Sequence, residues 1–160
     1  MKVTKNEDNL CLNFPEDKPV LLELDPLFKE ILGIEPLELN RGKDDYLAIF
    51  DNQKQIEQIQ PNLLLLSKLD SRGLVISAPG ERVDFVSRCF YPEAGIEEDP
   101  VTGSAHTMLI PYWANELDKY NLEANQLSKR GGKLTCVLAN NRVRISGKSV
   151  IFFEGIISIV

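Results

Sequence analysis

The sequence predicts a mixed α/β (α+β) fold in which a mostly antiparallel sheet wraps around one central helix. Many short apolar runs of strand length are separated by turn residues. One segment, residues 104–117, is apolar on nearly every side of a helix, and such a helix is buried. With 160 residues, the chain is long enough to bury one core. We therefore expect residues 1–160 to form a single domain.

Composition and charge exclude several classes of protein. Hydrophobic residues make up 43% of the chain and charged residues 26%, as in ordinary globular proteins. The net charge of −6 argues against binding to nucleic acid or to an anionic membrane surface, and no apolar run is long enough to span a membrane. Because the three cysteines form no Cys-x-x-Cys pair and the chain has one histidine, we expect no metal site, reduced thiols and a cytoplasmic location.

The first elements are a strand and a short helix. Residues 10–14 alternate weakly in hydropathy and stop at Pro15, as a strand does. Residues 27–32 are expected to form a helix because Asp25 is a good N-cap, Pro26 suits the first helical position and Gly33 suits the C-terminus.

The middle of the chain alternates between strands and helices. Residues 46–50 are a continuous apolar run that predicts a buried strand. Residues 53–69 have helical periodicity, and Pro61 is expected to split this helix, because proline lacks the backbone donor. Residues 74–78 and 83–91 predict two more strands.

The last third contains the apolar helix and four expected strands. A loop over residues 92–103 precedes the helix at 104–117, which Pro111 is expected to kink or shorten. Asn140-Asn141 suits a two-residue hairpin turn. The expected strands follow the helix and cover residues 122–127, 133–139, 142–146 and 149–160.

The segment from Asp99 to His106 is the candidate functional site. The first N–H groups of a helix have no internal partner and lie at the positive end of its dipole. Thr102, Gly103 and Ser104 are therefore a candidate cradle for a carboxylate or phosphate, with Asp99 at its rim as a proton acceptor or donor. His106, the only histidine, follows one turn later.

Each of these residues also has a purely structural interpretation. Thr102 or Ser104 is equally suited to cap the helix, and Asp99 with the following proline is also typical of a turn. A single histidine in an apolar helix is often a satisfied core residue. The segment is neither a Walker phosphate loop nor a nucleophile elbow, because it lacks the lysine and the Gly-x-Ser-x-Gly spacing.

Five segments resemble the phenazine-biosynthesis isomerase family, the PhzF-like proteins. The run Glu-Asp-Pro-Val-Thr-Gly-Ser-Ala-His at 98–106 is similar to the hallmark of that family, and Ser-Arg-Cys-Phe at 87–90 and Tyr-Trp at 112–113 flank it as expected. Gln-Leu-Ser-Lys-Arg-Gly-Gly at 126–132 and Leu-Asn-Phe-Pro at 12–15 also match family segments.

The resemblance implies a diaminopimelate-epimerase-like fold of two halves, with the active site between the N-termini of their central helices. It implies cofactor-free proton transfer on a small carboxylic acid. Asp99 matches the active-site acid of the family. Thr102, Gly103 and Ser104 match the substrate-binding helix start, with His106 in a supporting position.

The chain matches only the second half of such a protein, because members are about twice as long and their first half carries a Gly-Asn-Pro motif and a catalytic glutamate. No Gly-Asn-Pro occurs here. Three interpretations follow. The first is a truncated or split member that is inactive unless a separate first-half chain joins it, because the first-half catalytic glutamate is missing. The others are a homodimer that builds a composite site and a non-catalytic domain for small-acid binding or assembly. The apolar residues at 149–160 would pair with the missing half, so we also expect self-association.

Overall fold

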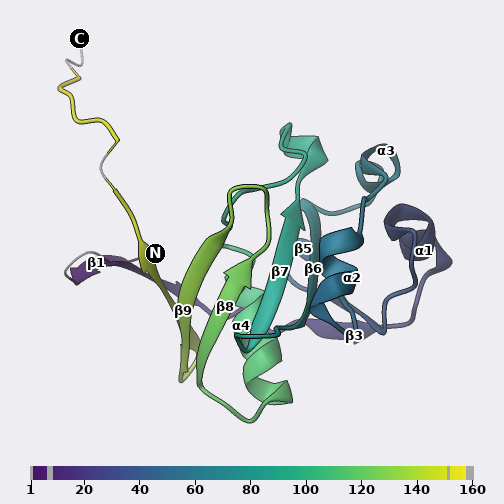
Figure 1. The fold of residues 1–160 in the computed structure, drawn as a ribbon, viewed down its shortest axis with the longest axis horizontal. Helices are drawn as coiled ribbons and strands as arrows, with labels where there is room; N and C mark the ends of the chain where they lie inside the picture. Colours follow the sequence, from purple (N-terminus) through teal and green to yellow (C-terminus); the bar gives the residue numbers. More distant parts are fainter. Residues whose placement is uncertain (1, 7–8, 151, 158–160) are drawn as a thin grey trace.

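The computed structural model describes residues 2–6, 9–150 and 152–157 and contains one ten-stranded sheet with helices on both faces (Figure 1). Its strand order is β1-β2-β10-β9-β8-β7-β6-β5-β4-β3. Neighbouring strands are antiparallel except for the pairs β5–β6 and β7–β8, which are parallel. The mixed, mostly antiparallel α+β architecture is thus confirmed.

The sheet and helices have the following bounds. The strands are β1 (Lys2–Asn6), β2 (Asn9–Pro15), β3 (Val20–Leu22), β4 (Glu38–Arg41), β5 (Asp45–Ile49), β6 (Gly73–Pro79), β7 (Phe85–Phe90), β8 (Asn121–Gln126), β9 (Gly132–Ala139) and β10 (Arg142–Lys148). The helices are α1 (Pro26–Leu32), α2 (Gln53–Gln58), α3 (Leu63–Leu66), a 3₁₀ turn η1 (Pro92–Ala94) and α4 (His106–Glu116).

The central strands are buried on both faces, which explains their continuous apolar sequences. In β6, Val75 packs into the core around α4, whereas Leu74 and Ile76 on the opposite face pack into the core below α1 and α2. In β7, Phe85 packs into the core around α4, and Phe90 packs into the core on the opposite face. Because side chains alternate along a strand, each of these strands contributes to two cores.

The helix α4 lies against one face of the sheet, as predicted, and six adjacent strands, β5 to β10, contribute side chains to the core around it. Trp113 of α4 stacks on Phe85 with ring centroids 5.8 Å apart, and its indole N–H donates to Ser77 Oγ at 2.9 Å. The two strands that flank the middle of this core, β7 and β8, are the ones that α4 connects.

Pro111 lies inside α4, and the helix continues through it. The expectation that this proline could shorten the helix is therefore wrong. Proline has no N–H to donate to the carbonyl four residues earlier, which is that of Thr107. Asp17 N donates to Thr107 O instead, at 2.9 Å. The carbonyl that proline leaves free therefore attaches the segment after β2 to the central helix.

Several local predictions are confirmed. Asp25 caps α1 by accepting from Leu27 N, and Gly33 ends the helix with a left-handed φ of 75°. The segment around Pro61 divides α2 from α3, as expected. Asn140, in the two-residue turn between β9 and β10, has a φ of 56°.

The structure departs from the sequence expectations at both ends of the chain and at one sheet edge. The strands β1, β3 and β4 were not predicted. The expected strand at 149–160 is wrong for residues 149–150 and 152–157, which form no regular structure; residues 151 and 158–160 lie outside the described residues. The described pairing of β10 ends before this segment: with β9 it stops at Ser146, and with β2 it stops where Lys148 lies opposite Asn9.

The stacked pair beneath α4 gives a stability prediction. Replacing Trp113 by alanine should lower the free energy of unfolding by about 3–5 kcal/mol, because it empties a large core volume and leaves Ser77 without its donor. Urea unfolding followed by circular dichroism measures this. The matched control is Tyr120→Ala, at an aromatic side chain that is 63% exposed, and a similar loss in both variants would contradict the assigned core.

Candidate functional site

The candidate site is the connection between β7 and α4, and hydrogen bonds to both neighbouring strands hold it. Asp99 N donates to Cys89 O of β7 at 2.9 Å. On the opposite side, Ser128 Oγ, just after β8, donates to Pro100 O at 2.7 Å. The loop is therefore attached to the ends of the two parallel strands that α4 connects.

Arg88 anchors the acidic part of this loop from below. Its guanidinium contacts Glu98 through two hydrogen bonds, Nε to Oε1 at 2.7 Å and Nη2 to Oε2 at 3.1 Å. Its Nη1 donates to the carbonyl oxygens of Ile56 and Ile59 at the end of α2. Arg88 is 7% exposed, so this is a nearly buried, bidentate ion pair, in which the planar guanidinium matches the carboxylate. Glu98 is thereby committed to structure.

Thr102 links the two titratable residues of the site. Its hydroxyl donates to Asp99 Oδ2 at 2.6 Å, and its carbonyl oxygen lies 2.7 Å from His106 Nδ1. Thr102 is itself 4% exposed. Thr102 is therefore a buried residue that hydrogen bonds to both Asp99 and His106.

Gln126 of β8 holds the loop through three hydrogen bonds, two to Thr102 and one to Asp99. Its Oε1 accepts from Thr102 N at 2.8 Å, and its Nε2 donates to Asp99 O at 2.7 Å and to Thr102 Oγ1 at 3.1 Å. Since the Thr102 hydroxyl accepts from Gln126, its own proton is directed to Asp99. The buried amide thus decides which way the hydroxyl points.

The partly exposed surface of the site consists of Asp99, Gly103 and Ser104. Within the described part of the chain, the N–H groups of Gly103, Ser104 and Ala105 have no hydrogen-bond partner. Residues 103–105 form a turn that leads directly into α4, so these donors lie at the positive end of the helix. Asp99, Gly103 and Ser104 therefore keep some solvent exposure in this segment, whereas Ala105 is fully buried.

The alternative that Thr102 or Ser104 only caps the helix is wrong. The N-cap position is Ala105, and no side chain caps α4. The Thr102 hydroxyl is used by Asp99, and Ser104 O accepts from both the N–H and the hydroxyl of Thr107. The helix starts two residues later than the sequence predicted.

His106 is fully buried beneath the loop, beside Phe85. Its Nδ1 hydrogen bonds to a carbonyl, so Nδ1 carries the proton and Nε2 is the unprotonated nitrogen. Nε2 is buried without a partner among the described residues. Desolvation lowers the pKa of His106 to about 4, with the bond to Thr102 opposing the shift. The imidazole is thus neutral, and its Nδ1–H donates to the Thr102 carbonyl from the buried side of the loop.

The structure brings together all five residues predicted from the sequence: Asp99, Thr102, Gly103, Ser104 and His106. It exposes three of them and buries two, Thr102 and His106. Sequence reasoning did not select Gln126 and Arg88 as site residues, although both belong to quoted motifs. For Arg88 the signal was a charged residue within the mostly apolar strand β7, a pattern that predicts a buried partner. The mostly polar strand β8 gave no such signal for Gln126.

The described residues offer no cluster of metal-ligating side chains at this site. No group of three or more His, Cys, Asp or Glu side chains suited to a metal ion occurs in residues 2–6, 9–150 and 152–157. The three cysteines are free, and burial raises the pKa of Cys89 and Cys136 to about 12. None of the helices in the described chain is long and apolar enough to cross a membrane.

Comparison with known proteins identifies the family. The family model for phenazine biosynthesis-like proteins (PhzC-PhzF) matches residues 25–155. The chain belongs to the PhzF family. An uncharacterized isomerase of Pseudomonas aeruginosa is 41% identical over 155 residues, which cover 97% of this chain and 60% of that protein. Phenazine biosynthesis-like domain-containing protein 2 of Mus musculus is 35% identical over 175 residues, covering 97% of this chain and 61% of the relative.

Solved structures of PhzF-family proteins share the fold. A PhzF-family protein of Enterococcus faecalis superposes with a TM-score of 0.90 at 40% identity, covering 94% of this chain and 58% of that one. A putative PhzC/PhzF protein of Clostridium difficile gives 0.88 at 41% identity, with coverage of 98% and 61%. The chain therefore spans about three-fifths of the length of the PhzF relatives it matches, somewhat more than the half expected.

The buried histidine gives a pH prediction. His106 has a pKa of about 4 when folded against 6.5 when exposed, so only the unfolded chain binds a proton between these values. Stability from this residue is present above pH 6.5 and is lost as the pH falls through 4, by about 3 kcal/mol in total. The free energy of unfolding of the wild type, measured from pH 7.5 to 4, should fall by this amount relative to His106→Asn. A difference that stays constant across this range would contradict the burial of His106.

Proposed function

We propose that the chain forms one wall of an isomerase site at which a small carboxylic acid undergoes cofactor-free proton transfer. Membership of a family that includes uncharacterized isomerases supports an isomerase-type activity. In this proposal Asp99 exchanges the proton, and the N–H groups of Gly103 and Ser104 bind the substrate carboxylate. Thr102 and His106 position the loop that carries them. A cytoplasmic location, consistent with three free cysteines, is part of the same proposal.

The observation that supports this most strongly is the pairing of one carboxylate with unpartnered backbone donors. Asp99 accepts a single described side-chain hydrogen bond, from the Thr102 hydroxyl, so its second oxygen is free for a substrate. Backbone donors at the start of α4 favour an anion, because they also carry the positive end of the helix dipole. A carboxylic acid bound there would lie next to a group able to accept its proton.

Proton transfer at carbon needs a second group on the opposite face of the substrate, positioned within hydrogen-bond reach. We propose that it comes from outside residues 1–160, either from a separate first-half chain or from a second copy. In a homodimer, two Asp99 carboxylates facing each other would raise one pKa and provide an acid–base pair. The alternative function is a non-catalytic domain that binds small acids or serves assembly.

Deuterium exchange tests the catalytic proposal. The purified chain is incubated in D2O with dihydro-hydroxyanthranilate, a cyclic amino-carboxylate, and incorporation is followed by NMR. Asp99→Asn should reduce exchange by about 10²–10⁴-fold, the usual size of a general acid–base contribution. The control is Glu97→Gln, which removes an exposed carboxylate two residues away and should leave exchange unchanged.

The outcomes separate the alternatives. Exchange that depends on Asp99 supports the isomerase site. Binding of the acid without exchange, weakened by Ser104→Ala, supports the non-catalytic domain instead. If the chain neither binds nor exchanges the acid, alone or self-associated, the homodimer site and the non-catalytic domain are refuted, and the split-enzyme site is then tested by repeating the exchange with a first-half chain added.

The C-terminal segment supports association with a partner. Its described apolar side chains, those of Val150, Phe152, Phe153, Ile156 and Ile157, are 81–100% exposed. In Figure 1 this segment extends away from the sheet beyond β10. Such a stretch of apolar surface is unfavourable in water unless another surface covers it.

Self-association through this segment is testable by size-exclusion chromatography with light scattering. The wild type should be a dimer at micromolar concentration, and the double variant Phe152→Asp/Phe153→Asp should be a monomer with an unchanged circular dichroism spectrum. Leu64→Asp, at an apolar residue of α3 that is 71% exposed, is the matched control and should remain dimeric. A wild-type monomer would rule out the dimer.

A further inference from the structure

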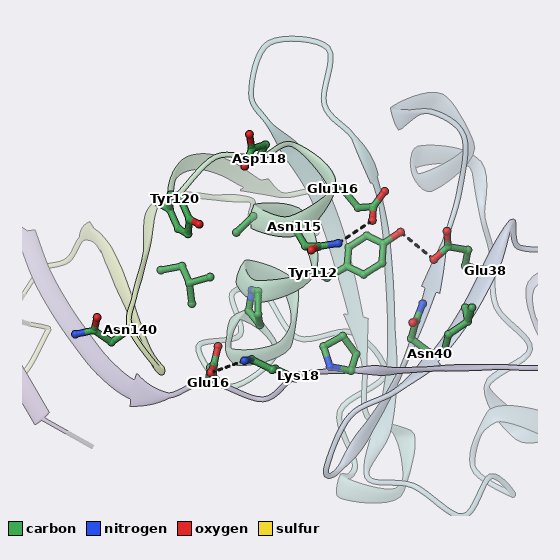
Figure 2. Close-up of a pocket in the computed structure, with 15 residues that line it drawn as sticks. Glu16, Lys18, Glu38, Asn40, Tyr112, Asn115, Glu116, Asp118, Tyr120 and Asn140 are labelled. Carbon is green, nitrogen blue, oxygen red and sulfur yellow. Dashed lines mark hydrogen bonds and ion pairs between the residues drawn. The ribbon is translucent and has the colours of Figure 1, made fainter.

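A second concave surface lies along the C-terminal half of α4, away from the loop at its N-terminus. This cleft has a volume of about 720 Å³, within the range of small-molecule sites. Glu38 and Asn40 of β4 line it together with Tyr112 and Glu116 of α4 (Figure 2). Leu138 of β9 also belongs to the lining. None of the five predicted site residues lines this cleft.

Two carboxylates flank one hydroxyl in the cleft. Tyr112 Oη donates to Glu38 Oε2 at 3.0 Å, and Glu116 lies near the same hydroxyl (Figure 2). Burial raises the pKa of Tyr112, and the charges of Glu38 and then Glu116 raise it further. The negative charges of Glu38 and Glu116 therefore both act on the Tyr112 hydroxyl.

The lining is acidic overall. Lys18 is the single cation among the lining residues, and it pairs with Glu16 at 3.2 Å. The charges of Glu38, Glu116 and Asp118 are left without a cationic partner in the cleft. An acidic surface with low-dielectric walls attracts positively charged ligands.

Asn40 adds an independent observation. This residue of β4 is 4% exposed, and its Nδ2 has no hydrogen-bond partner among the described residues. In Figure 2 its amide lies beside Glu38 and its nitrogen points toward the Tyr112–Glu38 pair. Because an unpaired buried donor is costly, such a group indicates an acceptor that binds there.

We propose that this cleft binds a small organic cation that carries both a primary ammonium and a carbonyl group. The ammonium is bound by Glu38 and Glu116, and the carbonyl accepts from Asn40 Nδ2. The aliphatic part between them lies on the apolar lining, to which Leu21, Pro111 and Leu138 contribute. The cleft is separate from the Asp99 loop, so Asp99→Asn leaves this binding unchanged.

Calorimetric titration of the full chain with two matched probes tests the charge requirement. The probes are Nα-acetyl-lysine methylamide and its norleucine analogue, which lacks the amine but keeps both carbonyls. The lysine probe should bind at least tenfold more tightly, and its affinity should fall as salt is raised. Equal affinities, or no binding of either probe, would overturn the proposal.

Variants of the cleft test the individual contacts. Glu38→Gln and Glu116→Gln should each weaken the lysine probe about tenfold, as expected for loss of a charge-assisted hydrogen bond. Glu30→Gln on α1, an equal charge change at an exposed site, should have no effect. Weakening by Glu30→Gln equal to that in the cleft would indicate only general attraction and overturn the site.

Asn40→Leu distinguishes a binding role from a structural one. The leucine is nearly isosteric and removes an unsatisfied donor, so the melting temperature should be unchanged or higher while the probe binds at least tenfold more weakly. A lower melting temperature with unchanged binding would show that Asn40 serves the fold and would overturn its assigned role. If this variant does not fold, the exposed Glu116 keeps the site testable through Glu116→Gln.

Discussion

The parallel pairing of β7 with β8 is the constraint on which both the Asp99 loop and the cleft at the other end of α4 depend. Parallel neighbours cannot be joined by a tight turn, so the chain must cross the face of the sheet between them. The crossover is α4, and its apolar residues are buried by six strands. The helix is therefore held by core packing along its length, and its two ends lie at defined places: one above β7 and β8, the other beside β4.

At the N-terminal end, polar contacts convert this placement into a candidate site. The loop before α4 is fixed by Arg88 through Glu98 and by Gln126 through Thr102, two contacts from the strands that α4 connects. Both anchors are nearly buried, so the bonds they make are costly to break. As a result, the carboxylate of Asp99 and the free N–H groups of the following turn are held in place before any ligand arrives. This is the preorganisation that acid–base chemistry requires.

At the other end of α4, the fold leaves polar groups incompletely satisfied. Asn40 and the pair of Tyr112 with Glu38 are positioned by β4 and α4, elements that are far apart in the sequence. Here the sheet does not close over the helix, and the exposed face is acidic. The same helix thus presents donors at one end and acceptors at the other, and the two proposals accordingly assign ligands of opposite charge to its two ends.

Where signals were local, the sequence was sufficient. The caps of α1, the break at Pro61 and the turn at Asn140 follow from dihedral preferences and missing donors, which act over a few residues. The strands β1, β3 and β4 were missed because their pairing partners, and not their own composition, define them. Residues 149–150 and 152–157 lie in an apolar stretch of strand composition, but the described pairing of β10 with β2 ends at Lys148 and that with β9 at Ser146. Strand formation needs a second chain segment at the right register, and that information is absent from a local pattern.

By itself, the sequence determined the mixed α+β class, the buried central helix and the grouping of Asp99, Thr102, Gly103, Ser104 and His106 around its start. Those residues are neighbours along the chain, so their grouping follows from the sequence alone. Only the tertiary structure decided that Thr102 and His106 are buried supports and that Gln126 directs the Thr102 hydroxyl toward Asp99. It also decided that Glu38, Asn40 and Glu116 share a cleft. Burial and contacts between distant segments arise from how the sheet packs around α4, which depends on every strand at once.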